Sequence, residues 1–273
     1  MSDAAALTRP SDDSGPDGEG ALLVATGVEK RFEGIAALID VSVQLGPGEL
    51  VALIGPNGAG KTTLFNCLSG YLRPDSGRIT MKGRDLAGLA PHQRARMGLA
   101  RTFQRIELFG GLTVRDHLIV ADRARRASGS LWRDLTGRAR TTADERNRCD
   151  AVLELVGLTD EAERPAPSLT LGRGRVVELA RALMCEPDLL FLDEPSSGLD
   201  HKETDEMGTV LEQIRDERGT AILLCEHDVG FVERLASRSY VLDLGRLVAE
   251  GPTGEVLARP EVRRAYLGQE AGS

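Results

Sequence analysis

The chain lacks the features that would indicate a membrane span, a disulfide framework or general nucleic-acid binding. No apolar run approaches the ~20 residues of a transmembrane helix, so no segment is expected to cross a bilayer. The four cysteines are scattered without metal-ligand spacing, which favours buried, reduced thiols. Lys and Arg number 34 against 42 Asp and Glu, and the net charge of −8 argues against general binding of nucleic acid.

The start of the chain lacks the basic and apolar segments of a secretion signal. Residues 1–20 are rich in small, acidic, proline and glycine residues, and they predict a disordered leader. The chain of 273 residues, 41% hydrophobic and 28% charged, can bury the core of one large domain or two subdomains. We therefore expect a globular protein that stays in the cytoplasm.

A glycine-rich loop with a lysine follows the apolar run Leu50–Ile54. Its residues are Gly55, Pro56, Asn57, Gly58, Ala59, Gly60, Lys61, Thr62 and Thr63. Glycines let the backbone curl so that successive N–H groups point inward, and a helix beginning at Lys61 directs its positive dipole end there. Lys61 can reach the β- and γ-phosphate oxygens of a nucleotide, and the Thr62 hydroxyl can coordinate magnesium. The motif predicts a nucleotide site, and its alternative is a chance glycine-rich turn.

Two adjacent carboxylates end a second apolar run, Leu189–Leu192. Such a run is typical of a buried parallel strand. Asp193 at the strand end is suited to hold magnesium through water. Glu194 is expected to face the γ-phosphate and to act as general base on an attacking water. The alternative is an acidic cap on a solvated edge, which the nearby phosphate loop disfavours.

Six motifs follow one another in an order that resembles the ATP-binding subunit of ABC transporters. They are the phosphate loop, Gln104, Leu169–Arg173, the pair Asp193 and Glu194, Ser197–Asp200, and His227. The resemblance runs from about Leu22 to the C-terminus. Within that family, four segments resemble the branched-chain (hydrophobic) amino-acid uptake group: Ala100–Gln104, Leu108–Phe109, Leu112–Val114 and Arg264–Gly268. The insertion from Arg123 to Arg148 resembles the longer of the two ATPases that such importers pair.

The resemblance implies an α/β fold, the P-loop NTPase of ABC type. Its RecA-like core with an antiparallel β subdomain would comprise residues 21–85 and 168–273, and an inserted helical subdomain would comprise residues 86–167. Strand-like runs at Leu22–Val28, Ala37–Leu45 and Gly77–Lys82 predict the antiparallel sheet. Alternating strands and helices from Leu189 to Val248 fit a mainly parallel sheet.

The resemblance also assigns residue roles, with ATP and Mg²⁺ as the cofactors. Catalytic roles fall to Glu194, His227 and Gln104, and magnesium would be bound by Thr62, Gln104 and Asp193. Phe32 would stack on adenine; its alternative is a core phenylalanine. In the closed dimer of the family, each ATP lies between the phosphate loop of one chain and a short signature segment of the other. That segment corresponds to Leu169–Arg173 in this chain. Here the residues of that segment that would contact phosphate are Thr170 and Gly172.

One residue departs from the family pattern. Relatives typically carry Leu-Ser-x-Gly-Gln where this chain has Leu169–Arg173. Thr170 keeps a hydroxyl and Gly172 keeps close backbone approach. Arg173 has two interpretations: it adds positive charge near the phosphates, or it points away and marks a site of reduced activity.

The implied partners are membrane permease subunits and a second ATPase subunit, either a different chain or a second copy, at the cytoplasmic face of the membrane. A solute-binding protein would take part indirectly, and no nucleic acid is expected. Apolar residues after Gln104 are candidates for contacting the permease, and packing within the subdomain is the alternative: Ile106, Leu108 and Phe109. The alternative functions are a lipid- or polysaccharide-exporter ATPase, a non-transport ABC ATPase acting on ribosome or DNA, and a weakly catalytic regulatory subunit.

The segment from Ala121 to Arg148 is locally basic, with eight arginines against four acidic residues. We expect a solvated helix face there, and contact with lipid headgroups is the second interpretation.

Overall fold

The computed structural model describes residues 20–102, 108–126 and 141–267. The predicted leader, apart from Gly20, lies outside these ranges. The strands are β1 (Leu23–Phe32), β2 (Ile35–Leu45), β3 (Leu50–Ile54), β4 (Ser76–Met81), β5 (Arg84–Asp85), β6 (Leu99–Arg101), β7 (Leu189–Asp193), β8 (Ala221–Cys225), β9 (Arg238–Asp243) and β10 (Arg246–Pro252).

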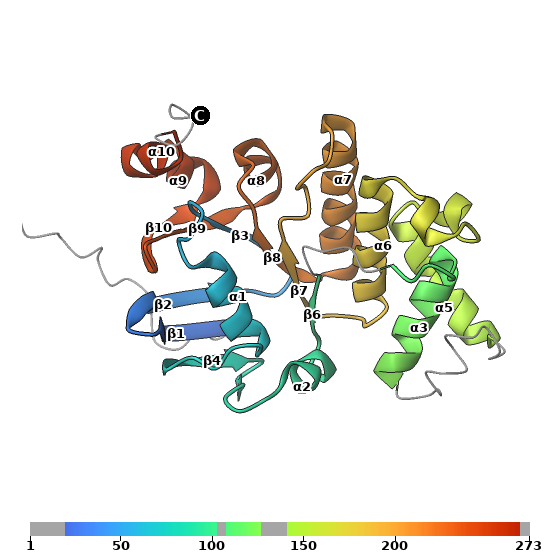
Figure 1. The fold of residues 1–273 in the computed structure, drawn as a ribbon, viewed down its shortest axis with the longest axis horizontal. Helices are drawn as coiled ribbons and strands as arrows, with labels where there is room; N and C mark the ends of the chain where they lie inside the picture. Colours follow the sequence, from blue (N-terminus) through green and yellow to red (C-terminus); the bar gives the residue numbers. More distant parts are fainter. Residues whose placement is uncertain (1–19, 103–107, 127–140, 268–273) are drawn as a thin grey trace, which may run out of the picture.

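Helices alternate with these strands through most of the chain (Figure 1). The α-helices are α1 (Lys61–Ser69), α2 (Pro91–Arg96), α3 (Val114–Arg126), α5 (Ala143–Leu155), α6 (Leu171–Leu183), α7 (His201–Arg218), α8 (Val229–Leu235), α9 (Thr253–Ala258) and α10 (Pro260–Leu267). Two 3₁₀ turns, η1 (Thr159–Glu161) and η2 (Ala166–Ser168), precede α6. None of the helices in the described part of the chain is long and apolar enough to cross a membrane.

The strands of the described residues form two sheets. An antiparallel sheet has the order β2-β1-β4-β5, and a six-stranded sheet has the order β10-β9-β3-β8-β7-β6. Strands β9, β3, β8, β7 and β6 of the larger sheet are parallel, and β10 is added antiparallel at one edge. The predicted α/β fold with an antiparallel β subdomain is confirmed.

The larger sheet is buried on both faces, and alternation along each strand decides which face a residue covers. In β3, Val51 and Leu53 pack with α1 and the antiparallel sheet, whereas Leu50, Ala52 and Ile54 face the opposite core. Strands β7 and β8 alternate in the same way. Since neighbouring strand residues point to opposite faces, these apolar runs have no solvated side. Helix α1 is therefore held between the two sheets.

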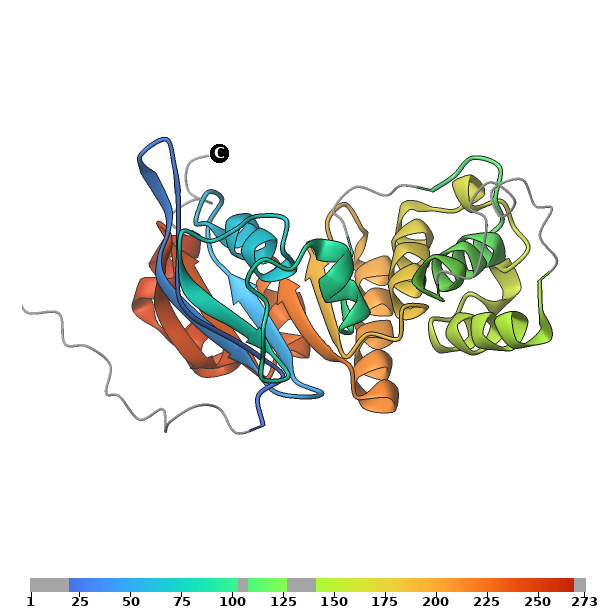
Figure 2. The same cartoon turned by 90° about the horizontal axis from the view of Figure 1, so that it is seen from below.

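Helices α3 and α5 lie at one end of the molecule, beyond α6 and α7 and away from the antiparallel sheet (Figure 2). A capping box begins α3, because the Asp116 amide donates to Thr113 Oγ1 and the Thr113 amide donates to Asp116 Oδ2. The predicted start of this helical part at residue 86 needs correction. Strand β6 pairs in parallel with β7 in the core sheet. Its backbone hydrogen bonds therefore assign Leu99–Arg101 to the core.

Ion pairs neutralise much of the basic segment within the chain itself. Arg126 and Arg148 both bind Asp122, a carboxylate with a side-chain exposure of only 1%. Arg125 binds Glu186, beyond the end of α6. Arg123 is buried rather than solvated. Three further arginines of the segment lie outside the described residues: Arg133, Arg138 and Arg140.

Arg123 and Glu145 form a buried fork between α3 and α5. Arg123 Nε and Nη2 lie 2.6 and 3.0 Å from Glu145 Oε1 and Oε2. The hydrogen bonds from Arg123 lower the pKa of the Glu145 carboxyl to about 2, from an ordinary value of 4.5. Glu145 also caps α5, since it accepts from the amide of Thr142. The pair thus fixes the start of α5 against α3.

We predict that Glu145→Gln lowers the free energy of unfolding by about 2 kcal/mol at pH 7. Because the folded pKa lies below the unfolded one, the carboxylate stabilises the fold above pH 4.5 and this contribution is lost as the pH falls toward 2. Urea denaturation of both proteins between pH 7 and pH 3 should show the difference shrink below about pH 4.5. A difference that is constant with pH would contradict the assignment.

Candidate nucleotide-binding site

The phosphate loop joins β3 to α1 and lies hard against neighbouring backbone. Gly55 and Gly60 have φ angles of +152° and +107°, in the region that favours glycine. A Cβ on Gly55 would lie 2.1 Å from the Leu242 carbonyl oxygen, and one on Gly60 would lie 2.6 Å from that of Ala37. No larger side chain fits either position. The loop path is therefore fixed by its contacts with β2 and the end of β9.

Lys61 is 7% exposed, and its ammonium is held inside the loop. Its Nζ donates to the carbonyl oxygens of Gly55 and Pro56, at 2.5 and 3.0 Å. Thr62, the next residue of α1, is exposed. A buried cation and an exposed hydroxyl thus stand side by side in the first turn of α1, where the helix dipole is positive.

Three strand ends meet beside this loop. Strands β3, β8 and β7 are parallel neighbours, with Leu53 opposite Cys225 and Cys225 opposite Asp193. The phosphate loop follows β3, the loop that contains His227 follows β8, and the loop that contains Glu194 follows β7. The structure therefore brings together three groups that are far apart in the sequence, at the edge where parallel sheets bind ligands.

Asp193 is buried and forms an ion pair that the sequence analysis missed. Arg101 Nη2 lies 3.0 Å from Asp193 Oδ2, and both side chains are about one-tenth exposed or less (8% and 10%). Arg101 Nη1 also donates to Asn66 Oδ1 and Ser69 Oγ on α1. One guanidinium therefore joins β6, β7 and the phosphate-loop helix. Arg101 lies in the segment Ala100–Gln104, which resembles the amino-acid uptake group, but the sequence did not predict a role for this arginine.

Glu194 has left-handed backbone geometry, with φ of +49°. This conformation is unfavourable for a residue with a side chain and persists only where neighbours enforce it. The Glu194 amide donates to the Cys225 carbonyl at 2.9 Å, and its own carbonyl accepts from Ser197 at 3.2 Å. The carboxylate is half-buried at the strand end. His227 follows β8 with its side chain 58% exposed.

Phe32 ends β1 and is 43% exposed, so it is not a core residue. The ammonium of Lys30 lies 5.6 Å from the centroid of its ring. An exposed aromatic ring of this kind is available for stacking on a base. Its role in binding adenine remains a prediction. Gln104 lies outside the described residues, as does Ile106.

The signature segment begins α6. Thr170 is the N-cap, and its Oγ1 accepts from the Arg173 amide and donates to Glu203 Oε1 at 3.0 Å. Gly172 is buried. The Arg173 guanidinium donates to the Gly157 carbonyl at 2.6 Å and to Glu161 Oε1 at 2.8 Å. Arg173 is therefore bound to the loop after α5, which favours a side chain that points away from the phosphates and says nothing of the activity.

A protein-family model described as "ABC transporter" matches residues 38–197. This match spans the phosphate loop, the signature segment and the carboxylates at the end of β7, and it covers more than half of the chain. The chain belongs to the ABC transporter ATPase family. A second model, "Branched-chain amino acid ATP-binding cassette transporter", matches residues 246–272.

Individual relatives of this ABC ATPase cover almost the full chain. The high-affinity branched-chain amino acid transport ATP-binding protein LivG of Salmonella typhimurium is 42% identical over 91% of this chain and 98% of its own. The lipopolysaccharide export system ATP-binding protein LptB of Haemophilus influenzae is 31% identical over the same shares. A crystal structure of the ADP conformation of an ABC transporter cassette matches with a TM-score of 0.79 and 27% identity, over 91% of this chain and 99% of that chain.

The residues of this ABC ATPase fit a magnesium ion bound together with ATP. Thr62 offers a hydroxyl and Asp193 a carboxylate, and Mg²⁺ prefers such oxygen donors. Within the described ranges, no three His, Cys, Asp or Glu residues gather into a group that could hold a metal ion. A magnesium ion that takes most ligands from phosphates and water needs no such group.

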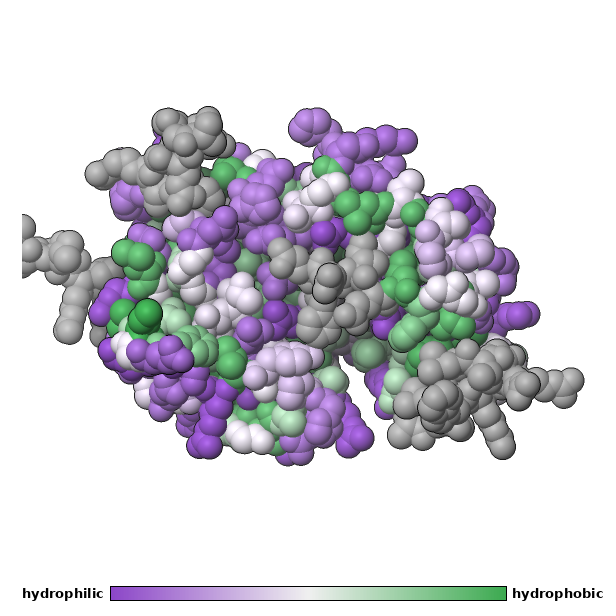
Figure 3. All heavy atoms as spheres, in the orientation of Figure 1, coloured by the Kyte–Doolittle hydropathy of each residue, from purple (hydrophilic) through white to green (hydrophobic). Residues whose placement is uncertain are grey.

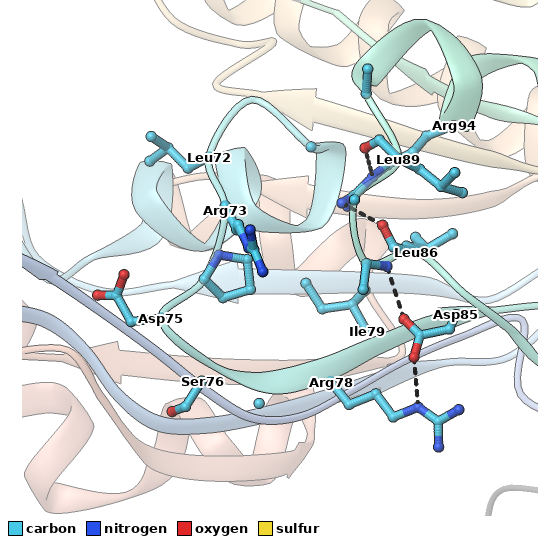
Figure 4. Close-up of a pocket in the computed structure, with 16 residues that line it drawn as sticks. Leu72, Arg73, Asp75, Ser76, Arg78, Ile79, Asp85, Leu86, Leu89 and Arg94 are labelled. Carbon is cyan, nitrogen blue, oxygen red and sulfur yellow. Dashed lines mark hydrogen bonds and ion pairs between the residues drawn. The ribbon is translucent and has the colours of Figure 1, made fainter.

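A separate cavity of about 390 Å³ lies between the end of α1, β4 and α2 (Figure 4). None of the predicted site residues lines it. Arg94 borders it, 4% exposed, and donates to the carbonyls of Leu86, Leu89, Cys67 and Leu68. The last two carbonyls belong to the final turn of α1. Arg94 thus satisfies the C-terminal end of the phosphate-loop helix.

We predict that Glu194→Gln leaves ATP binding intact and lowers ATP turnover by about 100-fold or more, because the amide cannot accept a proton from water. Nucleotide affinity and steady-state turnover should be measured on the same preparation. Glu154→Gln, on the exposed face of α5, is the matched control and should keep the parent rate. Parent-rate hydrolysis by Glu194→Gln would remove Glu194 from the role of base.

We predict that Arg94→Met lowers the free energy of unfolding by about 3 kcal/mol, because buried carbonyls of α1 lose their donor. Arg94→Lys keeps the charge without the planar fork and should lie between the two proteins. Urea denaturation measures both. A loss below about 0.5 kcal/mol for Arg94→Met would show that other donors cap α1.

Proposed function

We propose that the chain is the ATP-hydrolysing subunit of an ABC importer for branched-chain or related hydrophobic amino acids. It would work at the cytoplasmic face of the membrane with permease subunits and a second ATPase subunit. The observation that carries the proposal is the 42% identity to LivG over nearly the whole length of both chains, together with the match of residues 246–272.

The site geometry supports a division of labour in hydrolysis. Lys61 and the amides of the phosphate loop would bind the β- and γ-phosphates and offset their charge. Glu194 would take the proton of the attacking water, and His227 would contact the γ-phosphate. A magnesium ion held by Thr62 and Asp193, with Gln104, would neutralise charge that develops on the phosphate oxygens. Closure of two chains around ATP would drive the permease through a population shift.

The alternative functions have weaker support. The lipopolysaccharide-exporter relative is 31% identical, against 42% for the amino-acid importer relative. The net charge of −8 argues against an ABC ATPase that acts on the ribosome or on DNA, because binding to nucleic acid depends on positive charge. The hypothesis of a weakly catalytic subunit depends on Arg173 alone. The other two residues of the segment that would contact phosphate, Thr170 and Gly172, lie at the N-cap and in the first turn of α6.

The structure describes two of the candidates for contact with the permease, Leu108 and Phe109, and Phe109 is the better one. Leu108 is partly buried against the core, whereas Phe109 is 48% exposed. The Phe109 amide donates to Nε2 of the buried His117, whose Nδ1 lies 2.8 Å from the Thr113 carbonyl. Nε2 accepts, so Nδ1 carries the proton and the imidazole is neutral; burial correspondingly lowers the pKa of His117.

An exposed aromatic ring on a fixed backbone suits a protein contact, because little conformational entropy is lost on binding. The Phe109 ring also stacks on His117, with centroids 5.8 Å apart. On the face drawn in Figure 3, hydrophobic residues gather in small groups among hydrophilic ones. The exposed Phe109 ring would offer the permease a local apolar contact of this kind.

The proposal is tested by recovering the Glu194→Gln protein from its native membranes with ATP and magnesium and identifying its partners by mass spectrometry. We expect two permease chains and a second, shorter ATPase. Ribosomal or DNA-bound partners, or the absence of any membrane partner, would overturn the importer assignment.

We predict that Phe109→Ala lowers ATP-driven amino-acid uptake by about tenfold or more while basal ATP turnover of the purified chain stays within about twofold. Uptake into proteoliposomes that contain the recovered complex measures the first, and phosphate release the second. Val248→Ala, another half-exposed hydrophobic residue, is the control and should affect neither. Equal loss of uptake and turnover in Phe109→Ala would assign Phe109 to folding instead.

A further inference from the structure

Glu226 is a fully buried carboxylate that the proposed chemistry does not use. Its exposure is 0%, and it stands between β8 and His227. Each of its oxygens has a donor. Oε1 accepts from the amide and the hydroxyl of Ser196, at 2.9 and 2.6 Å, and Oε2 accepts from the amide of His227 at 3.0 Å. Burial of a carboxylate costs free energy, and hydrogen bonds to both of its oxygens compensate for that cost.

These hydrogen bonds join the two loops that carry the predicted catalytic side chains. Ser196 lies two residues after Glu194, in the loop after β7, and His227 lies in the loop after β8. Next to Glu226, the Cys225 carbonyl accepts from the amide of Glu194. The last residue of β8 and the first residue of the loop after it thus bind the amides of Glu194 and Ser196 in the loop after β7. The distance between Glu194 and His227 depends on this arrangement.

A cation from the signature helix stands close to the same group. Arg175 on α6 donates from Nη2 to the Ser197 carbonyl at 2.8 Å. The charges of Glu226 and Glu194 both act on Arg175 and oppose the lowering of its pKa by burial. Arg175 therefore supplies positive charge near two carboxylates, and it ties α6 to the loop after β7.

We propose that Glu226 is a positioning residue for ATP hydrolysis, holding the His227 backbone and the Ser196 turn so that His227 and Glu194 address the same water. This inference rests on the proposed roles of those two residues. A carboxylate suits the task because both of its oxygens accept. Glutamine has the same size but only one acceptor, so its amide nitrogen must face an N–H donor on one of the two loops.

The test is Glu226→Gln in the full-length chain. We expect kcat to fall by about 10- to 100-fold, because a small misplacement of catalytic groups has effects of this size. The KM for ATP and the affinity for trinitrophenyl-ATP should stay within about twofold, because no phosphate contact is removed. Hydrogen exchange at the His227 amide, followed by mass spectrometry of peptides that contain it, should become faster than in the parent chain.

Two controls separate positioning from general destabilisation. Glu49→Gln makes the same change at a partly buried carboxylate that pairs with Arg238 away from this site. It should lower the melting temperature and leave kcat unchanged. Ser196→Ala removes only one of the hydrogen bonds to Glu226, so it should fold even if Glu226→Gln does not, with a smaller fall in kcat.

His227→Ala distinguishes failure of this inference from failure of the proposed site. If Glu226 acts in part through His227, adding Glu226→Gln to His227→Ala should lower kcat by clearly less than Glu226→Gln lowers it in the parent chain. An unchanged kcat in Glu226→Gln, or a full and independent loss in the double variant, would overturn the inference. An unchanged kcat in His227→Ala would instead overturn the proposed role of His227.

Discussion

The parallel pairing of β3, β8 and β7 is the constraint on which the rest of the structure depends. Backbone hydrogen bonds set Leu53, Cys225 and Asp193 in register. The loops that follow must then emerge at one edge of the sheet, whatever their own sequences. The apolar alternation of these strands fixes the pairing, because each face is buried against a different core. The site is therefore a consequence of how the core packs.

Buried polar groups connect the parts that the core only brings near. Arg101 joins β6, α1 and Asp193, and Arg94 caps the far end of α1. Glu226 joins the loops after β7 and β8. Each bond is made where water is excluded, so it is stronger and more directional than a surface bond, and a missing partner is expensive. Such contacts specify the geometry that phosphoryl transfer requires.

The sequence predicts the sheets and most of the local site, because their signals are local. Its glycines and Lys61 predict the phosphate loop, and an apolar run before two carboxylates predicts the end of β7. The edge strand β6 and the roles of Arg101 and Glu226 were not predicted. A strand of three residues and two isolated charged side chains carry no periodic signal. Asn66 lies 35 positions from Arg101, and Ser196 lies 30 positions from Glu226, so neither contact can be predicted from neighbouring residues. Only the folded arrangement defines them.

We propose that the edge formed by β3, β7 and β8 is one ATP site in which each named residue has the role given above. The most direct measurement is the structure of the full-length Glu194→Gln chain with ATP and magnesium. We expect phosphates against the loop at Lys61, a magnesium ion bound by Thr62 and Asp193, and the γ-phosphate beside residues 194 and 227. A nucleotide bound elsewhere, or a γ-phosphate distant from the ends of β7 and β8, would contradict it.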